Sequence, residues 1–364
     1  MMRTAAFYTQ ATKALAASWQ RLHRLVGFRN GYDFVLWCIF ALGLLGFAIS
    51  RAPYLDYYGV FCKPNSLTTN LHAAPGECYF FLNGGREQIG MMLHLYGIIP
   101  CCILLFFQFV PVIRQKAILF HRINGYVVII LMAVALVGGL MAVKNSFGGD
   151  MSFQVANVLL GASIPICLSL AMINIKRLQI DQHRAWMLRT WFLAASIITM
   201  RIIQSIASRA ISGQGYAAIR PCAQIDSDGV LPKSVIEHSW PQCAAYFTGA
   251  RPDQQVLVRA DYYGLPIEIN VAISIVSGAS AFTALFLHAV GVELYLNLTP
   301  AESERLRQAS CRKQSALGLR RPARIESAID QFEASSKLSS HVDGKEGVGS
   351  DVSSETSSEV AAHE

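Results

Sequence analysis

Six long apolar stretches, separated by shorter polar segments, dominate the pattern of hydrophobic and polar positions along the chain. They cover residues 34–50, 90–113, 120–143, 151–175, 186–211 and 266–296. A hydrocarbon core about 30 Å thick needs roughly 20 apolar residues per crossing helix, and each stretch reaches or approaches that length. Strand patterns, in which apolar and polar residues alternate, are absent, so a β-barrel is not expected. Because a helix satisfies its own backbone hydrogen bonds where water is absent, the pattern predicts an all-α, polytopic membrane bundle of about six helices.

Composition supports a membrane protein. The chain has 364 residues, of which 53% are hydrophobic and 15% charged, whereas soluble domains carry about 25% charged residues. The net charge of +7 comes mainly from short segments beside the apolar stretches. The lipid bilayer is therefore the expected partner, and no nucleic-acid partner is expected.

The distribution of Lys and Arg predicts the orientation. Basic residues precede the first stretch, follow the sixth, and separate the second from the third and the fourth from the fifth. Cytoplasmic loops carry such an excess. Both termini are therefore expected in the cytoplasm, in a plasma membrane or a membrane of the secretory pathway.

Four of the nine cysteines lie in the two long loops that this orientation places outside the cytoplasm. Disulfides persist in that oxidising compartment. Pairing of Cys62 with Cys78 and of Cys222 with Cys243 is the first choice. Four cysteines allow three connectivities, and unpaired thiols are the alternative.

Three regions are expected. Residues 1–31 carry basic but no acidic residues, which is typical of an interfacial amphipathic arm, favoured here, or of a targeting presequence. Residues 32–298 form the membrane domain. Residues 299–364 form a cytoplasmic tail, expected to be largely disordered because its end is rich in Ser, Glu, Asp and Gly and poor in aromatic residues.

Four polar residues are expected to converge near the outer ends of the helices as a binding pocket: His94, Arg201, Glu268 and Asn270. An arginine within the membrane should face the bundle interior and pair, and Glu268 is its expected partner. The alternative is an arginine that extends outward and a glutamate among the lipid headgroups.

Two His-Arg pairs, His121-Arg122 and His183-Arg184, open the third and fifth stretches at the predicted cytoplasmic boundary. Two imidazoles at matched depth on facing helices suit the axial ligands of haem b, with Arg122, Arg184 and Arg189 placed to neutralise its propionates. The alternative is that these pairs mark the membrane boundary and contact lipid phosphate.

Several of these residues also form a recognisable series. It comprises His94, Pro100, Gln108-Phe109, Arg114, His121-Arg122-x-x-Gly125-Tyr126, Gly138-Gly139, His183-Arg184-x-Trp186-Met187-x-Arg189 and Arg201. Over residues 89–201 the chain resembles the multi-pass membrane family named domain of unknown function 2306. The resemblance implies a shared helical membrane core and supplies no activity. Gly138-Gly139 is expected to permit close helix approach.

Two functions are weighed. The first is a haem-binding or redox membrane protein. The rival is a transporter of a small molecule or lipid, or an accessory membrane protein of a biosynthetic pathway. An integral-membrane enzyme ranks below both, because no motif identifies a nucleophile or a metal site. The sequence does not predict the oligomeric state.

Overall fold

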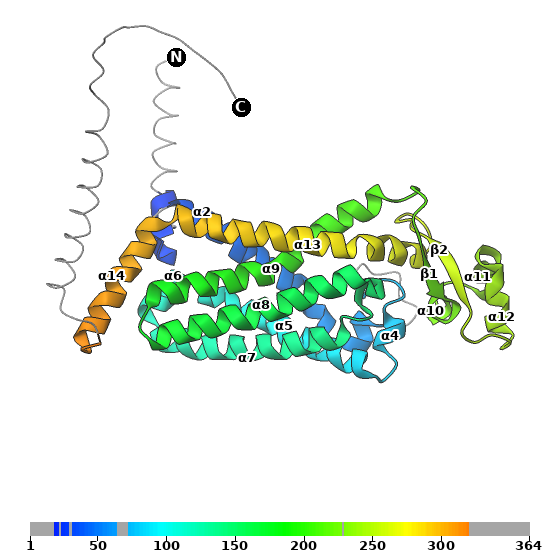
Figure 1. Cartoon of the computed structure of the whole chain (residues 1–364), viewed down its shortest axis with the longest axis horizontal. Helices are drawn as coiled ribbons and strands as arrows, with labels where there is room; N and C mark the ends of the chain where they lie inside the picture. Colours follow the sequence, from blue (N-terminus) through cyan, green and yellow to red (C-terminus); the bar gives the residue numbers. More distant parts are fainter. Residues whose placement is uncertain (1–17, 22, 29–30, 64–71, 228, 320–364) are drawn as a thin grey trace, which may run out of the picture.

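The computed structural model describes residues 18–21, 23–28, 31–63, 72–227 and 229–319. Its long helices lie side by side along the long axis of the molecule (Figure 1). They are α5 (Arg86–Gln108), α7 (Ile118–Ala142), α8 (Met151–Lys176), α9 (Ile180–Ala210) and α13 (Pro266–Leu298). Together with Gly31–Leu55, they make six described segments that are long and apolar enough to cross a membrane. The prediction of a six-helix membrane bundle is confirmed.

The first membrane segment is not one regular helix. It consists of α2 (Gly31–Trp37), a π-helical turn at Cys38–Leu42, α3 (Gly43–Arg51) and a 3-10 turn at Ala52–Leu55. These parts follow one another as an almost continuous helical segment along the chain.

The second membrane helix ends earlier than the apolar pattern predicts. That pattern continues to residue 113, whereas α5 ends at Gln108 and the short helix α6 (Pro111–Lys116) follows. Val110 has an extended backbone (φ −83°, ψ 111°), because a proline disfavours helical geometry in the residue before it. The break places the basic residues of α6 across the end of the bundle.

Helices α5 and α7 approach closely through glycines. A Cβ atom on Gly138 of α7 would lie 2.5 Å from the carbonyl oxygen of Gly90 on α5. A Cβ on Gly97 would lie 2.9 Å from the backbone nitrogen of Ala135. Neither position has room for a side chain, which confirms the packing role expected for Gly138.

One end of the bundle, which we call the cap end, carries the two long loops (Figure 1). The loop after α9 forms an antiparallel pair of strands, β1 (Ala217–Pro221) and β2 (Gln255–Arg259), with Ala217 opposite Arg259. Between the strands lie α10 (Cys222–Ser227), α11 (Lys233–Ser239), a 3-10 turn at Pro241–Cys243 and α12 (Ala244–Phe247).

The sheet corrects the expectation that strand patterns are absent. Val256 and Val258 of β2 are buried, while their neighbours in the strand are exposed. This is the period-2 alternation of a half-buried strand, in a segment too short to stand out beside the membrane helices. The buried face packs with Trp240 and Val271 in the core of the cap.

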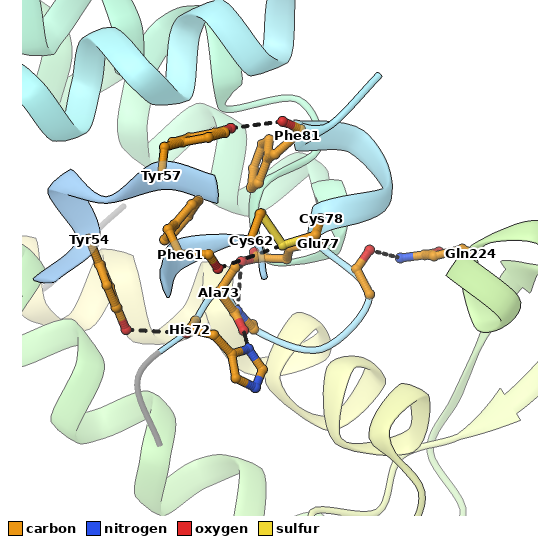
Figure 2. The surroundings of a disulfide bond; sticks show 12 residues. Tyr54, Tyr57, Phe61, Cys62, His72, Ala73, Glu77, Cys78, Phe81 and Gln224 are labelled. Atoms are coloured by element: carbon orange, nitrogen blue, oxygen red, sulfur yellow. Dashed lines mark hydrogen bonds between the residues drawn. A yellow bond between two sulfur atoms is a disulfide. The ribbon is translucent and has the colours of Figure 1, made fainter. Parts of the chain in front are cut away.

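Both predicted disulfides are present. Cys222 and Cys243 are bonded to each other within the core of the cap. Cys62 and Cys78 join the two ends of the other loop (Figure 2).

The loop that holds Cys62 and Cys78 contains a π-helical turn at Tyr57–Phe61 and helix α4 (Cys78–Phe81). The hydroxyl of Tyr57 donates to the carbonyl oxygen of Phe81 at 2.8 Å (Figure 2). Gln224 of α10 donates to the carbonyl oxygen of Gly76 at 3.1 Å, so the two cap loops are in direct contact.

The opposite end, which we call the basic end, carries α6 and the helix α14 (Pro300–Ala316) (Figure 1). Helix α14 occupies the start of the predicted tail. The predicted disordered segment lies outside the described residues, as does most of the predicted N-terminal arm, of which residues 18–21 and 23–26 are helical.

Candidate functional site

The first candidate site surrounds Arg201, in the half of α9 nearer the cap end. The Arg201 guanidinium carbon lies 3.9 Å from the centre of the Phe147 ring, which places a cation over an aromatic face. The charged groups of Glu77 and Arg51 lie close enough to act on Arg201. These neighbours come from the first cap loop, the first membrane segment and the turn between α7 and α8.

Arg201 is enclosed by the protein and yet accessible. Groups from several segments surround it within the bundle, but its side chain is exposed. The guanidinium is therefore packed against its neighbours on one side and open on another. We call Arg201 and the side chains around it the Arg201 site.

His94 of α5 belongs to the same site. Its charge interaction with Arg201 places the two side chains near each other. A hydrogen bond of 2.9 Å joins the His94 Nδ1 to the carbonyl oxygen of Ala135 on α7. In a neutral imidazole, Nδ1 then carries the hydrogen and Nε2 is left as an acceptor. Gly139 makes room for the ring, because a Cβ there would lie 3.1 Å from Nδ1.

Glu77, which is buried, holds the turn beneath Arg201. One carboxylate oxygen of Glu77 accepts a hydrogen bond of 2.6 Å from the backbone nitrogen of Phe147. Phe147 adopts left-handed backbone angles (φ 49°, ψ 42°), which are uncommon for a residue with a side chain. Such strain is found where the surrounding structure enforces it, and it is concentrated at functional sites.

Glu268 does not pair with Arg201, contrary to the expected ion pair. Its carboxylate lies 3.3 Å from a guanidinium nitrogen of Arg259, and it accepts a hydrogen bond of 2.8 Å from the backbone nitrogen of Leu265. Glu268 therefore caps the start of α13, where a carboxylate is favoured by the helix dipole. Glu77 takes the place beside Arg201 that was predicted for Glu268.

Asn270 binds a different arginine. It accepts a hydrogen bond of 3.1 Å from Nε of Arg220 and donates one of 2.7 Å to the carbonyl oxygen of Pro75. Arg220 is buried, and its Nη2 has no hydrogen-bond partner among the described residues. Burial lowers the pKa of Arg220. Asn270 thus joins the cap to α13, and its hydrogen bonds are not with Arg201, beside which it was predicted to lie.

Of the four residues predicted for this pocket, the structure brings His94 and Arg201 together. Sequence reasoning missed Glu77, Phe147 and Arg51. Glu77 and Phe147 lie in loops, and no spacing along the chain relates them to Arg201. The Gly148-Gly149 pair was a visible sign of a sharp turn, and both glycines have positive φ.

The basic end gathers the residues predicted as haem ligands. His121 and His183 lie close enough to interact electrostatically, and Arg114 acts on both. The Nδ1 of His183 is bonded to the carbonyl oxygen of Ala171 at 2.9 Å. Arg184 donates to the hydroxyl of Thr299 at 3.4 Å.

Arg122 is exposed. Arg189 forms two hydrogen bonds with the Glu293 carboxylate, of 2.6 and 3.0 Å. Glu293 therefore already neutralises the positive charge of Arg189, which was expected to meet a haem propionate.

An internal cavity of about 10 Å³ lies between α8, α9 and α13 and is lined in part by Asn157, Ser196 and Met200. That is about the space one water molecule needs, so this cavity does not hold a ligand of metabolite size. Among the described residues, no three His, Cys, Asp or Glu side chains are grouped as a metal site.

The six apolar helices and the polar groups enclosed among them define a multi-pass helical membrane protein. Within this class, residues 91–221 match the family described as predicted membrane protein (DUF2306). The match confirms the resemblance found over residues 89–201, and it extends that resemblance to the end of β1.

A curated relative is the Ava biosynthesis cluster protein G of Aspergillus versicolor. It is 23% identical to this chain, and the similarity covers 76% of this chain and 91% of the relative. The similarity therefore extends well beyond the family match. No solved structure matches the chain.

Proposed function

We propose that this membrane protein binds a small organic anion at the Arg201 site. The observation that carries the proposal is an arginine of a membrane-spanning helix that has groups from several segments around it and still has an exposed side chain. A charged side chain within a membrane bundle is costly, and such residues line ligand or ion pathways when they face an internal space.

The charges around Arg201 favour an anion. Among the described residues, Arg201 and Arg51 contribute two positive charges, and Glu77 contributes one negative charge. Two of the carboxylate's four lone-pair positions are used by the backbone nitrogens of Ala74 and Phe147. His94 adds an imidazole acceptor that could take a proton from the ligand.

The biological role that fits is an accessory or transport function in a biosynthetic pathway. The relative's printed name places that protein in a biosynthesis cluster, and an anion-binding membrane protein would hold or move a pathway intermediate. The relative's name supports the role, and its 23% identity assigns no particular intermediate.

Benzoate and benzamide provide a matched test, because they differ in charge but hardly in shape. We expect benzoate, and not benzamide, to raise the thermal unfolding midpoint of the detergent-solubilised protein. Arg201→Ala should abolish the shift, since it removes the positive charge that meets the carboxylate. Arg209→Ala is the matched control, because Arg209 is exposed near the end of the same helix and binds Tyr262 at 3.1 Å. Equal effects of benzoate on both variants would contradict the proposal.

A haem-binding function is the second candidate. The observation that favours it is the bond from His183 Nδ1 to Ala171, since a ligating histidine usually anchors its other nitrogen to such an oxygen. Protein purified from haem-replete cells would then absorb strongly in the Soret region. A colourless preparation that still responds to benzoate would favour the anion-binding function.

The orientation is a proposal too: the basic end in the cytoplasm and the disulfides on the other side. The basic residues of α6 and α14 support it through the positive-inside tendency, and the two disulfides support it through their compartment. A membrane-impermeant thiol reagent on the cytoplasmic side should label Cys311 of α14. Labelling of Cys311 from the opposite side would reverse the orientation.

A further inference from the structure

A second group of cations, at the basic end, surrounds Arg114 of α6. Its side chain is exposed, and partial loss of water beside the neighbouring helices lowers the pKa of Arg114. The charges of Arg184, Arg305 and Glu302 all act on it. Arg114 therefore lies on a surface shared with the starts of α9 and α14, and we call this surface the Arg114 recess.

Helix α14 forms one side of the recess because it is fixed against α9. The hydroxyl of Ser310, which is buried, accepts a hydrogen bond of 2.8 Å from the backbone nitrogen of Ile180 and donates one of 3.0 Å to the Asp181 carboxylate. Gln314 donates to the carbonyl oxygen of Arg177 at 3.0 Å. These contacts hold the second half of α14 beside the start of α9, while the start of α14, with its charged residues, follows directly on α13.

The positive charges of the recess are not balanced by the described residues. Arg114, Arg184 and Arg305 contribute three positive charges and Glu302 contributes one negative charge. Glu302 is already bonded to Arg305, at 2.7 Å. Burial raises the pKa of Glu302, but its hydrogen bond to Arg305 and the nearby arginine charges outweigh this and hold the pKa below its usual value. Glu302 is thus shared among three arginines, and the other contacts of Arg184, with the Thr299 hydroxyl and the Tyr295 ring, supply no negative charge.

Two imidazoles add hydrogen-bonding capacity beside the arginines. Both His121 and His183 lie within electrostatic reach of Arg114. The Nδ1 of His121 is buried and has no hydrogen-bond partner among the described residues. A buried polar atom without a partner costs roughly 1–3 kcal/mol in typical proteins, so an acceptor or donor from a bound group is favoured at this place.

We infer that the Arg114 recess binds a phosphate group. A phosphate carries one to two negative charges and several acceptor oxygens, which match the two unbalanced arginines and the neighbouring imidazole. The group comes either from the headgroup of an anionic phospholipid or from a free phosphate compound. This site is separate from the Arg201 site, which lies toward the other end of α9, and does not depend on its function.

The test compares Arg114→Ala with Lys116→Ala. Lys116 lies on the same short helix and is exposed. Its replacement by alanine removes the same charge as the replacement of Arg114. One arm measures the unfolding midpoint of the solubilised protein in inorganic phosphate against chloride at equal ionic strength. The other measures binding of the protein in phosphatidylcholine nanodiscs to added phosphatidic acid by native mass spectrometry.

We expect the wild-type protein and Lys116→Ala to bind phosphate, phosphatidic acid or both, and Arg114→Ala to bind on the order of tenfold or more weakly, as for the loss of a charge-assisted hydrogen bond. A response to inorganic phosphate identifies the free compound as the source, and a response to phosphatidic acid alone identifies the headgroup. If Arg114→Ala does not fold, Arg184→Ala takes its place and the same loss is expected. No response in either arm, or equal responses of the arginine and lysine variants, would overturn the inference.

Discussion

At the scale of single residues, Glu77 determines the geometry of the Arg201 site. It is buried, and its two carboxylate oxygens accept from the backbone nitrogens of Ala74 and Phe147, at 3.2 and 2.6 Å. Of the charged groups that act on Arg201, Glu77 has the largest effect. One side chain thus fixes the left-handed turn at Phe147 and balances a charge inside the bundle.

Glu77→Ala should destabilise the protein by roughly 2–4 kcal/mol, because it leaves the partly buried backbone nitrogen of Phe147 unpaired and removes the negative charge that acts on Arg201. Glu77→Gln should cost less, since the amide oxygen still accepts one of the two hydrogen bonds. The losses of stability in the two variants are measured as changes in the free energy of unfolding in detergent.

The control for Glu77 is Glu237→Ala. Glu237 forms an ion pair with Lys233 on the cap surface, and both side chains are partly exposed. Its loss should change the free energy of unfolding by less than about 0.5 kcal/mol. A loss for Glu77→Ala no larger than for Glu237→Ala would contradict the role given to Glu77.

The residue scale also shows how far sequence reasoning reaches. His94 and Arg201 could be paired in advance because depth along a helix follows from residue count at about 1.5 Å per residue. The acidic partner of Arg201 could not be predicted, because Glu77 lies in a loop. Glu268, the predicted partner, instead pairs with Arg259 and caps the start of α13. Which acid reaches an arginine depends on how loops fold, and no periodicity encodes that.

At the scale of elements, the membrane helices were predictable because their signal is local and long. The end of α5 was predicted five residues too late, at residue 113 in place of Gln108, although Pro111 indicated a break. Strand β2 was missed because a stretch as short as Gln255–Arg259 gives only two buried valines. Helix α14 was not expected, since its stability comes from contacts such as Ser310 with Ile180 as well as from its own sequence.

The contact between α5 and α7 gives a prediction at this scale. Gly138→Leu should destabilise the protein by about 1–3 kcal/mol or prevent folding, because a Cβ there already meets the backbone of Gly90 and His94 at 2.5 Å. The measurement is the thermal unfolding midpoint, with the yield of monodisperse protein as a second readout.

Gly291→Ala in α13 is the matched control, since a Cβ there meets nothing within 4 Å. It should be neutral or slightly stabilising, because alanine favours the helix over glycine. A Gly138→Leu protein as stable as Gly291→Ala would show that α5 and α7 do not approach as described.

At the scale of the whole molecule, the two ends differ in chemistry. The cap end has the two disulfides and a core around Trp240 and Val258. The basic end has α6, α14 and the Arg114 recess. This division was visible in the sequence from the distribution of cysteines and basic residues, whereas the packing of the two cap loops against each other was not, because it depends on contacts such as Gln224 with Gly76.

The central claim is that Arg201 faces a water-accessible space that attracts anions. Cysteine in place of His94 tests it, in a protein whose five free cysteines are replaced by alanine. The reaction rates of this cysteine with an anionic and a cationic methanethiosulfonate report both access and local charge. Ile202→Cys is the control, because Ile202 is 59% exposed beside Arg201 and belongs to the apolar surface of the bundle.

We predict that the cysteine at position 94 reacts with both reagents and faster with the anionic one, and that Arg201→Ala removes this preference. The cysteine at position 202, surrounded by detergent or lipid, should react slowly with both reagents and without a dependence on Arg201. A cysteine at position 94 that stays unmodified, or that reacts with no preference for the anion, would contradict the account.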